Sequence, residues 1–470
     1  MNARPAPQCG ALLLLATLLL LAVAGFVLAL AFASTNPEAA RRRITENALA
    51  QAREALLAYA AARAINETVG PGYLPCPDLD NDGWAEATCG SLAGDVGQDE
   101  RLGRLPWKTL GIADLRDGDG ERLWYAVSTK YKGLLNCAAS AACIDMSPEA
   151  ALGSITVRDS TGALVHDGTI AEPYRAAEGG AAAVVIAPGA PLMRIEAGGD
   201  RGRLQSRDCA PGDCDEAGRC LTDPPRRAAA CDPANYLDMA PGASPGSEDN
   251  ADFIDRRANG FIQGPVVVAG GRIAVNDRLL AIGYGDVMPR IMRRVALEVA
   301  ACIRARRDAL GRYPPPVPLC AQSHPGAVTW IGIEDSAFGR LADADWGESC
   351  NLAPAAAHSW WKAWREHVFY ARMPGALDIV DIDGRVMARG RDAAVIVAGP
   401  ALVRDGFVQQ RDDAALGDIR QWLEASNALL EGAGGCAVAP PFACEAAHTC
   451  TRITQDNARP GFNDVVLAIP

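Results

Sequence analysis

A short acidic segment is the part of this sequence with the clearest metal-binding chemistry. It spans residues 78–86 and reads Asp-Leu-Asp-Asn-Asp-Gly-Trp-Ala-Glu. Carboxylates at positions 1, 3 and 5, followed by a glycine for the sharp turn, form the first half of a calcium-binding loop, in which position 7 supplies a backbone carbonyl. The predicted calcium ligands are therefore Asp78, Asp80, Asp82, the backbone of Trp84, and Glu86.

Two cysteines near this loop bear on whether it binds calcium, one observation favouring the ion and one opposing it. Cys76 and Cys89 bracket it, so a disulfide between them would hold it in shape. However, Cys89 occupies position twelve, where a calcium loop carries a bidentate glutamate. An acidic solvated turn without a metal stays open as the alternative, because Asp and Gly are common in turns.

The chain has fifteen cysteines and only five histidines, which favours disulfides in an oxidising compartment over zinc sites. Cys9 lies before a long apolar stretch, which leaves fourteen cysteines to pair. We predict the bonds Cys76–Cys89, Cys137–Cys143 and Cys320–Cys350, two bonds among Cys209, Cys214, Cys220 and Cys231, and two among Cys302, Cys436, Cys444 and Cys450. Spacing alone does not determine this connectivity.

Sequence motifs for catalysis and for nucleic-acid binding are lacking. The segment Gly-Ala-Ser-Pro-Gly at 242–246 fits G-x-S-x-G, but Pro245 has no backbone N–H to donate to an oxyanion. The sequence contains neither H-E-x-x-H nor a P-loop. With 45 basic and 57 acidic residues, the net charge of −12 disfavours binding to phosphate backbones. We therefore predict no catalytic residues and no nucleic-acid partner.

Three tryptophans, Trp360, Trp361 and Trp364, share one face if their segment is helical. Core packing is the favoured interpretation of this face. An exposed patch that stacks on a ligand is the alternative.

The N-terminal region contains an uncharged stretch over residues 10–33. Its 24 residues exceed the roughly 20 that span a bilayer as a helix, so we expect a single-pass inner-membrane anchor, with the rest of the chain in the periplasm or at the cell surface. The sequence Ala-Phe-Ala at 31–33 also fits a signal-peptide cleavage site. Secretion with removal of residues 1–33 is thus the competing hypothesis.

The region after this stretch contains an internal duplication. A helical segment after Pro37 corresponds to one from Pro289 onward, and four strand-like segments follow each helix in the same order. These segments are Gly103–Leu105 with Gly339–Leu341, Glu121–Ala126 with Glu366–Ala371, Ala183–Ala187 with Ala394–Ala398, and Asn276–Ile282 with Asn463–Ile469. We predict an α+β fold with a leader and anchor at 1–36, a first helix-plus-antiparallel-sheet unit at 37–282 with a Cys-rich insertion at 200–260, and a degenerate second unit at 289–470.

An apolar helix that continues into an amphipathic helix and a disulfide-bearing β-rich globule resembles the type IV pilin and pseudopilin family. The segments Leu74–Asp78, Gly103–Trp107 and Gly120–Ala126 are similar to those of large pilin-like proteins. The resemblance implies a minor pilin-like subunit of a type IV pilus or type II secretion machine. Its expected partners are the membrane, through residues 10–33, and other pilin-like subunits or assembly components. Leu15 stands where the family carries a glutamate after the leader glycine, here Gly10. An adhesin and a periplasmic hydrolase remain as alternatives.

Overall fold

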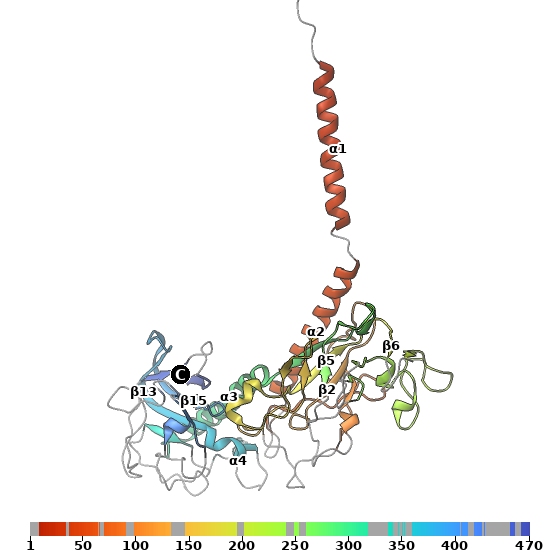
Figure 1. Ribbon diagram of the computed structural model, residues 1–470. Helices are drawn as coiled ribbons and strands as arrows, with labels where there is room; N and C mark the ends of the chain where they lie inside the picture. The colour runs from red at the N-terminus through yellow and green to blue at the C-terminus, as the bar shows by residue number, and fades with distance from the viewer. Residues whose placement is uncertain are drawn as a thin grey trace, which may run out of the picture.

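The computed structural model shows a globule built on two antiparallel sheets, with one helix standing away from it (Figure 1). The residues described are 9–33, 37–63, 65, 70–90, 98–132, 146–194, 202–240, 249–252, 260–317, 337–341, 346, 350, 352, 360–404, 406–411, 418–424, 427, 452–455 and 462–470. Within α1 the structure describes the side chains of residues 14–26 only.

Two long helices belong to the globule. Helix α2 (Pro37–Ala62) begins at the proline that the sequence predicts as its start. Helix α3 (Tyr284–Leu310) begins five residues before Pro289, because the Asp286 carboxylate accepts the N–H of Gly283 at 3.0 Å and closes the first turn there. The other helices of the described residues are α1 (Cys9–Ala33) and the short α4 (Trp360–Trp364).

The two main sheets share one strand arrangement. The first has the order β1 (Leu102–Arg104), β2 (Trp124–Val127), β5 (Ala183–Ala187) and β11 (Arg278–Ile282). The second has the order β12 (Phe338–Arg340), β13 (Val368–Val380), β14 (Val386–Val397) and β18 (Val465–Ile469), with β17 (Arg452–Thr454) parallel to β13. Register is also shared: Gly103 lies opposite Tyr125 in the first sheet, and Gly339 opposite Tyr370 in the second.

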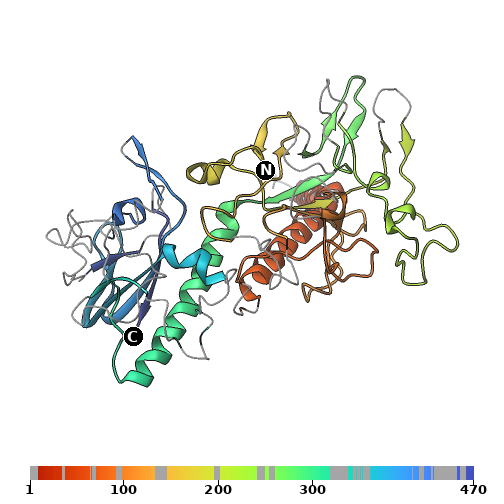
Figure 2. The ribbon, with the colours of Figure 1, turned by 90° about the horizontal axis from the view of Figure 1, so that it is seen from below.

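Successive side chains of the central strands point to opposite faces of the sheet, so the core has one layer on each face. Tyr125 and Val185 of the first sheet pack toward α2 and α3, whereas Trp124 and Ile186 pack toward a layer of loops on the opposite face. The second sheet repeats this division, and α3 lies between it and the first unit (Figure 2). Each sheet thus has a helix on one face and a layer of irregular loops on the other.

Short strands and single 3₁₀ turns make up the irregular layers. The strand pairs are β3 (Val157–Arg158) with β4 (Leu164–His166) and β8 (Phe261–Ile262), β6 (Met193–Arg194) with β7 (Arg203–Leu204), β9 (Val266–Val267) with β10 (Ile273–Val275), and β15 (Val403–Arg404) with β16 (Phe407–Val408). The 3₁₀ turns are η1 (Gln98–Arg101), η3 (Pro173–Glu178), η4 (Pro225–Arg227), η5 (Pro233–Asn235), η7 (Arg365–His367) and η9 (Ile419–Gln421).

These observations correct the predicted fold class and location. In the part of the chain that the structure describes, no helix combines the length and the apolar character needed to cross a bilayer. The predicted transmembrane helix over 10–33 and the single-pass inner-membrane location are therefore not supported. The fold is a mixed α/β arrangement with most strands in several small sheets, and the predicted domain boundaries remain predictions.

Candidate functional site

The acidic loop brings three of its predicted ligands together. One carboxylate oxygen each from Asp78, Asp80 and Glu86 lies within 4.8 Å of the other two. The loop is held by the Cys76–Cys89 disulfide and by the Asp78 backbone, which exchanges two hydrogen bonds of 3.0 and 2.7 Å with Arg104. The cluster is therefore attached directly to the edge strand β1.

Two backbone N–H groups donate hydrogen bonds to the Asp78 carboxylate and so occupy part of its capacity to bind a metal. Its carboxylate accepts N–H groups from Asp82 at 3.2 Å and Gly83 at 2.7 Å. Gly83 has a φ of +89°, and a Cβ there would lie 2.7 Å from the indole nitrogen of Trp107, so only glycine fits this turn. The glycine at position six thus has the role that the loop pattern predicts for it.

Burial and like charge shape the electrostatics of this loop. Burial raises the pKa of Asp78 to about 7, the Gly83 hydrogen bond opposes the rise, and the charges of Asp82 and Asp80 add to it. Burial also raises the pKa of Glu86. One cation is already present, since the Arg219 guanidinium lies 2.7 Å from Asp80. Three converging carboxylates facing one guanidinium fit a hard, oxygen-seeking divalent cation.

Asp82 does not join the three converging carboxylates, and the role of the Trp84 backbone carbonyl stays a prediction. The Asp82 carboxylate instead accepts the Trp84 N–H at 2.7 Å, and the Trp84 side chain is exposed. The backbone oxygen of Asp82 accepts a hydrogen bond from the Lys108 ammonium. The structure thus groups three of the four predicted side-chain ligands.

A second polar cluster, which sequence analysis missed, lies buried behind the first sheet. Asp238 and Asp277 meet there: the Asp277 carboxylate accepts the Asp238 N–H at 2.8 Å and the Asn250 side-chain amide at 2.8 Å. The Gln205 amide donates to Asp238 at 2.9 Å, and the Arg207 guanidinium donates to Gln205 at 3.1 Å. These five side chains connect the insertion to the start of β11.

The second unit contains the same cluster with one conservative change. Asp464 accepts the Glu424 N–H at 3.1 Å and the Asn427 amide at 3.2 Å. Gln409 and Arg411 take the places of Gln205 and Arg207, with a donor–acceptor distance of 3.2 Å between them. The recurrence of Gln-x-Arg-Asp at 205–208 and 409–412 was the sequence signal that could have revealed this cluster.

Burial determines the protonation of these carboxyl pairs. In the first unit it raises the pKa of Asp238 to about 6 and that of Asp277 well above its usual range, with the Asp238 charge adding to the latter. Burial likewise raises the pKa of Glu424 and of Asp464. Because these groups accept backbone and amide N–H groups, their evident chemical role is to satisfy the buried polar layer.

The disulfides agree with three of the predicted bonds or groupings and correct two. Cys76–Cys89, Cys209–Cys214 and Cys220–Cys231 form, so the four insertion cysteines pair among themselves as predicted. Cys350 pairs with Cys302 on α3, so the predicted Cys320–Cys350 bond and the predicted grouping of Cys302 with the C-terminal cysteines are wrong. Cys137, Cys143, Cys320, Cys436, Cys444 and Cys450 lie outside the described residues.

The tryptophan face is buried. Trp360, Trp361 and Trp364 are at most 5% exposed and belong to the main core, which confirms core packing over a ligand-stacking patch. Nearby His367 is also buried, its pKa is lowered well below the usual range by burial, and its ring meets Trp422 edge-on at 5.3 Å. The candidate segment 242–246 lies outside the described residues.

Comparison with known proteins adds no family. No model of a protein family, no curated protein and no solved structure matches this chain.

Proposed function

We propose that this protein is a non-enzymatic, pilin-like subunit of a type IV pilus or a type II secretion apparatus, in which α1 mediates assembly. The observation that carries the proposal is the position of α1, which projects from the globule (Figure 1). Its large apolar side chains are 53–70% exposed over residues 14–26. A helix that is apolar on all sides needs a covering surface, and other subunits of an assembly offer one.

The arrangement behind α1 supports the same proposal. Helix α2 follows α1 in the chain and packs on the antiparallel sheet through β5 and β11. It is fastened to α3 by ion pairs from Arg53 to Asp286 at 2.6 Å and from Arg290 to Glu54 at 2.8 Å. The Cys76–Cys89 disulfide lies in the same core as α2, and the Cys220–Cys231 disulfide braces the insertion. A rigid globule with one projecting apolar helix suits a subunit that is held in an assembly by that helix.

Charges on α1 test this function. We expect Leu18→Glu/Leu21→Glu to convert a self-associating protein into a monomer, because two carboxylates on one helix face cannot be buried between subunits without a large desolvation cost. Sedimentation velocity at micromolar concentration measures the change. The matched control is Ile44→Glu, an exposed apolar position on α2, which should assemble like the wild type. Equal mass distributions for all three proteins would refute an assembly role for α1.

We also propose that the acidic loop binds calcium through Asp78, Asp80 and Glu86. With a dissociation constant of about 10⁻⁴ to 10⁻³ M, typical of extracellular modules, 10 mM calcium is expected to stabilise the fold by about 1.5–3 kcal/mol. Thermal unfolding with and without calcium measures this stabilisation. Asp80→Asn should lose it, whereas Asp82→Asn should keep it, since Asp82 lies outside the three-carboxylate cluster. A shift of the same size in both variants would exclude this site.

A further inference from the structure

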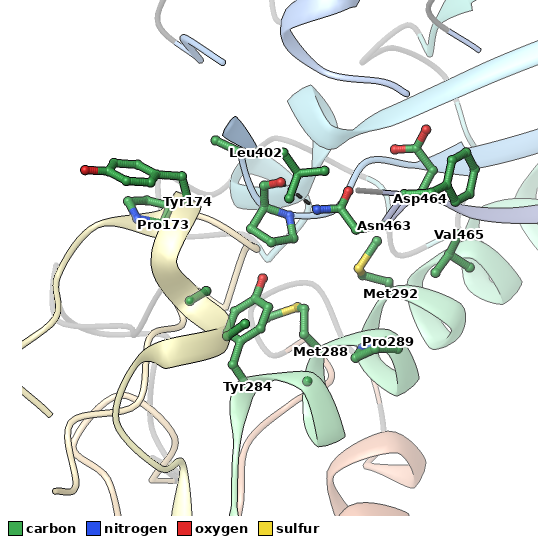
Figure 3. Close-up of a pocket in the computed structure, with 16 residues that line it drawn as sticks. Pro173, Tyr174, Tyr284, Met288, Pro289, Met292, Leu402, Asn463, Asp464 and Val465 are labelled. Carbon is green, nitrogen blue, oxygen red and sulfur yellow. Dashed lines mark hydrogen bonds between the residues drawn. The ribbon is translucent and has the colours of Figure 1, made fainter. Parts of the chain in front are cut away.

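A cavity of about 290 Å³ lies between the two units. Its walls are η3 of the first unit, the first turns of α3, and the segments at 400–402 and 462–465 of the second unit (Figure 3). Tyr284, Met288 and Met292 form the floor on α3, and Leu402 faces them from the second unit. Tyr174 at the edge is 38% exposed, so the cavity can be reached from solvent.

The lining of this cavity suits an uncharged apolar group. Among the described residues of the lining, Asp464 is the only one with a carboxylate, and its Oδ2 atom accepts N–H groups from Glu424 and Asn427. Figure 3 shows the Asp464 carboxyl group turned away from Met288 and Met292. Methionine side chains adapt to ligands of different shape, and apolar cavities of about 150 Å³ already hold a benzene ring. One leucine or phenylalanine side chain therefore fits here.

The chain itself supplies such groups. Helix α1 exposes leucines along the whole of residues 14–21, and Phe26 is 67% exposed. In the structure α1 points away from the globule that contains the cavity (Figure 1). An unpaired apolar helix and an apolar cavity of the same molecule are complementary surfaces, and a second copy can bring them together.

We propose that the cavity between the two units takes an apolar side chain of α1 from a second copy of this chain. This inference rests on the proposed assembly role of α1 and names one surface that covers it. Helix and cavity are different surfaces of one molecule, so the contact is heterologous and leaves a free helix at one end and a free cavity at the other. Assembly should therefore grow with protein concentration beyond a dimer.

Filling the cavity tests the proposal without removing a contact. Gly285 lines the cavity on α3, and a Cβ there meets nothing within 4 Å, so Gly285→Leu should occupy the space. Replacing a helical glycine also favours the helix, so the variant should fold. We expect its average mass in sedimentation velocity to fall to that of the monomer. Arg293→Leu, an exposed position of α3 outside the cavity, is the matched control and should assemble like the wild type.

A mixing experiment identifies the occupant. Gly285→Leu retains α1 but lacks the cavity, whereas Leu18→Glu/Leu21→Glu retains the cavity but lacks a suitable helix face. The proposal predicts that neither assembles alone and that an equimolar mixture forms one-to-one complexes. If Gly285→Leu assembles normally while the α1 variant does not, the cavity proposal fails and the proposed function stands. If both stay monomeric in the mixture, α1 is not the occupant; if the α1 variant assembles, the proposed function itself fails.

Discussion

Replacing Arg411 by alanine is expected to lower the free energy of unfolding by about 3–5 kcal/mol, because it removes a buried guanidinium from the partly buried Glu149 carboxylate and from the backbone oxygens that it satisfies. The Arg411 side chain is 3% exposed and lies 2.8 Å from the Glu149 carboxylate of the first unit. The same Glu149 oxygen accepts the backbone N–H of Ala401 at 2.8 Å. This contact therefore links the two units.

The Arg411 guanidinium also satisfies groups within the second unit. It donates to the backbone oxygens of Gln421 at 3.0 Å and Trp422 at 3.2 Å, and it lies 5.3 Å from the Trp422 ring centre. Arg411→Lys keeps the charge but cannot reproduce this forked donation, so it should recover only part of the loss. Urea unfolding followed by tryptophan fluorescence measures both variants, since Trp422 lies in the affected layer.

An exposed ion pair provides the control for Arg411. Arg420 pairs with Asp418 at 2.8 Å, but its side chain is 53% exposed, so Arg420→Ala should cost less than about 1 kcal/mol. A double-mutant cycle with Glu149→Gln separates the contact between the units from the contacts within the second unit. If Arg411→Ala were no more costly than Arg420→Ala, the buried contact would not stabilise the protein.

Sequence periodicity predicted much of the secondary structure, since helices and central strands depend on local patterns. The predicted start of α2 at Pro37 agrees with the structure, and the apolar runs 183–187 and 394–398 lie on the central strands β5 and β14. The start of α3 was missed because capping by Asp286 places it before Pro289. The membrane assignment of 10–33 relied on the length and the uncharged composition of that stretch, and the described residues do not support it.

Long-range partners were harder to predict than local elements. Cys350 could pair with any of several cysteines, and its partner Cys302 is determined by how α3 packs on the second sheet. The acidic loop was visible because its residues are close in sequence, yet its contact with Arg219, 139 residues later, was not. The duplicated polar cluster joins side chains up to 72 residues apart, from Gln205 to Asp277, and only a comparison of both units could have suggested it.

The two buried carboxyl pairs should make the protein lose stability as the pH rises, relative to a variant in which amides replace the buried carboxyl groups. A carboxyl group whose folded-state pKa is raised binds more protons when folded, so its stabilising contribution is complete below the unfolded-state pKa and is lost as pH rises through the folded-state value. For Asp238 that value is about 6, and Asp277 lies well above its ordinary value because of burial and the Asp238 charge. Wild-type stability should therefore fall between pH 5 and pH 8 by about 1–3 kcal/mol from these groups.

Asp277→Asn and its counterpart Asp464→Asn isolate this effect. An amide keeps an oxygen that accepts from Asn250 or Asn427, but it cannot ionise, so the double variant should gain stability relative to the wild type as pH rises from 5 to 8. The comparison must be a difference between proteins, because buried His367 acts oppositely: its lowered pKa costs stability as pH falls below about 6.5. His367 is unchanged in both proteins and cancels in the difference. Thermal or urea unfolding at each pH measures it, and a difference that stays constant from pH 5 to 8 would mean that the buried pairs do not titrate in this range.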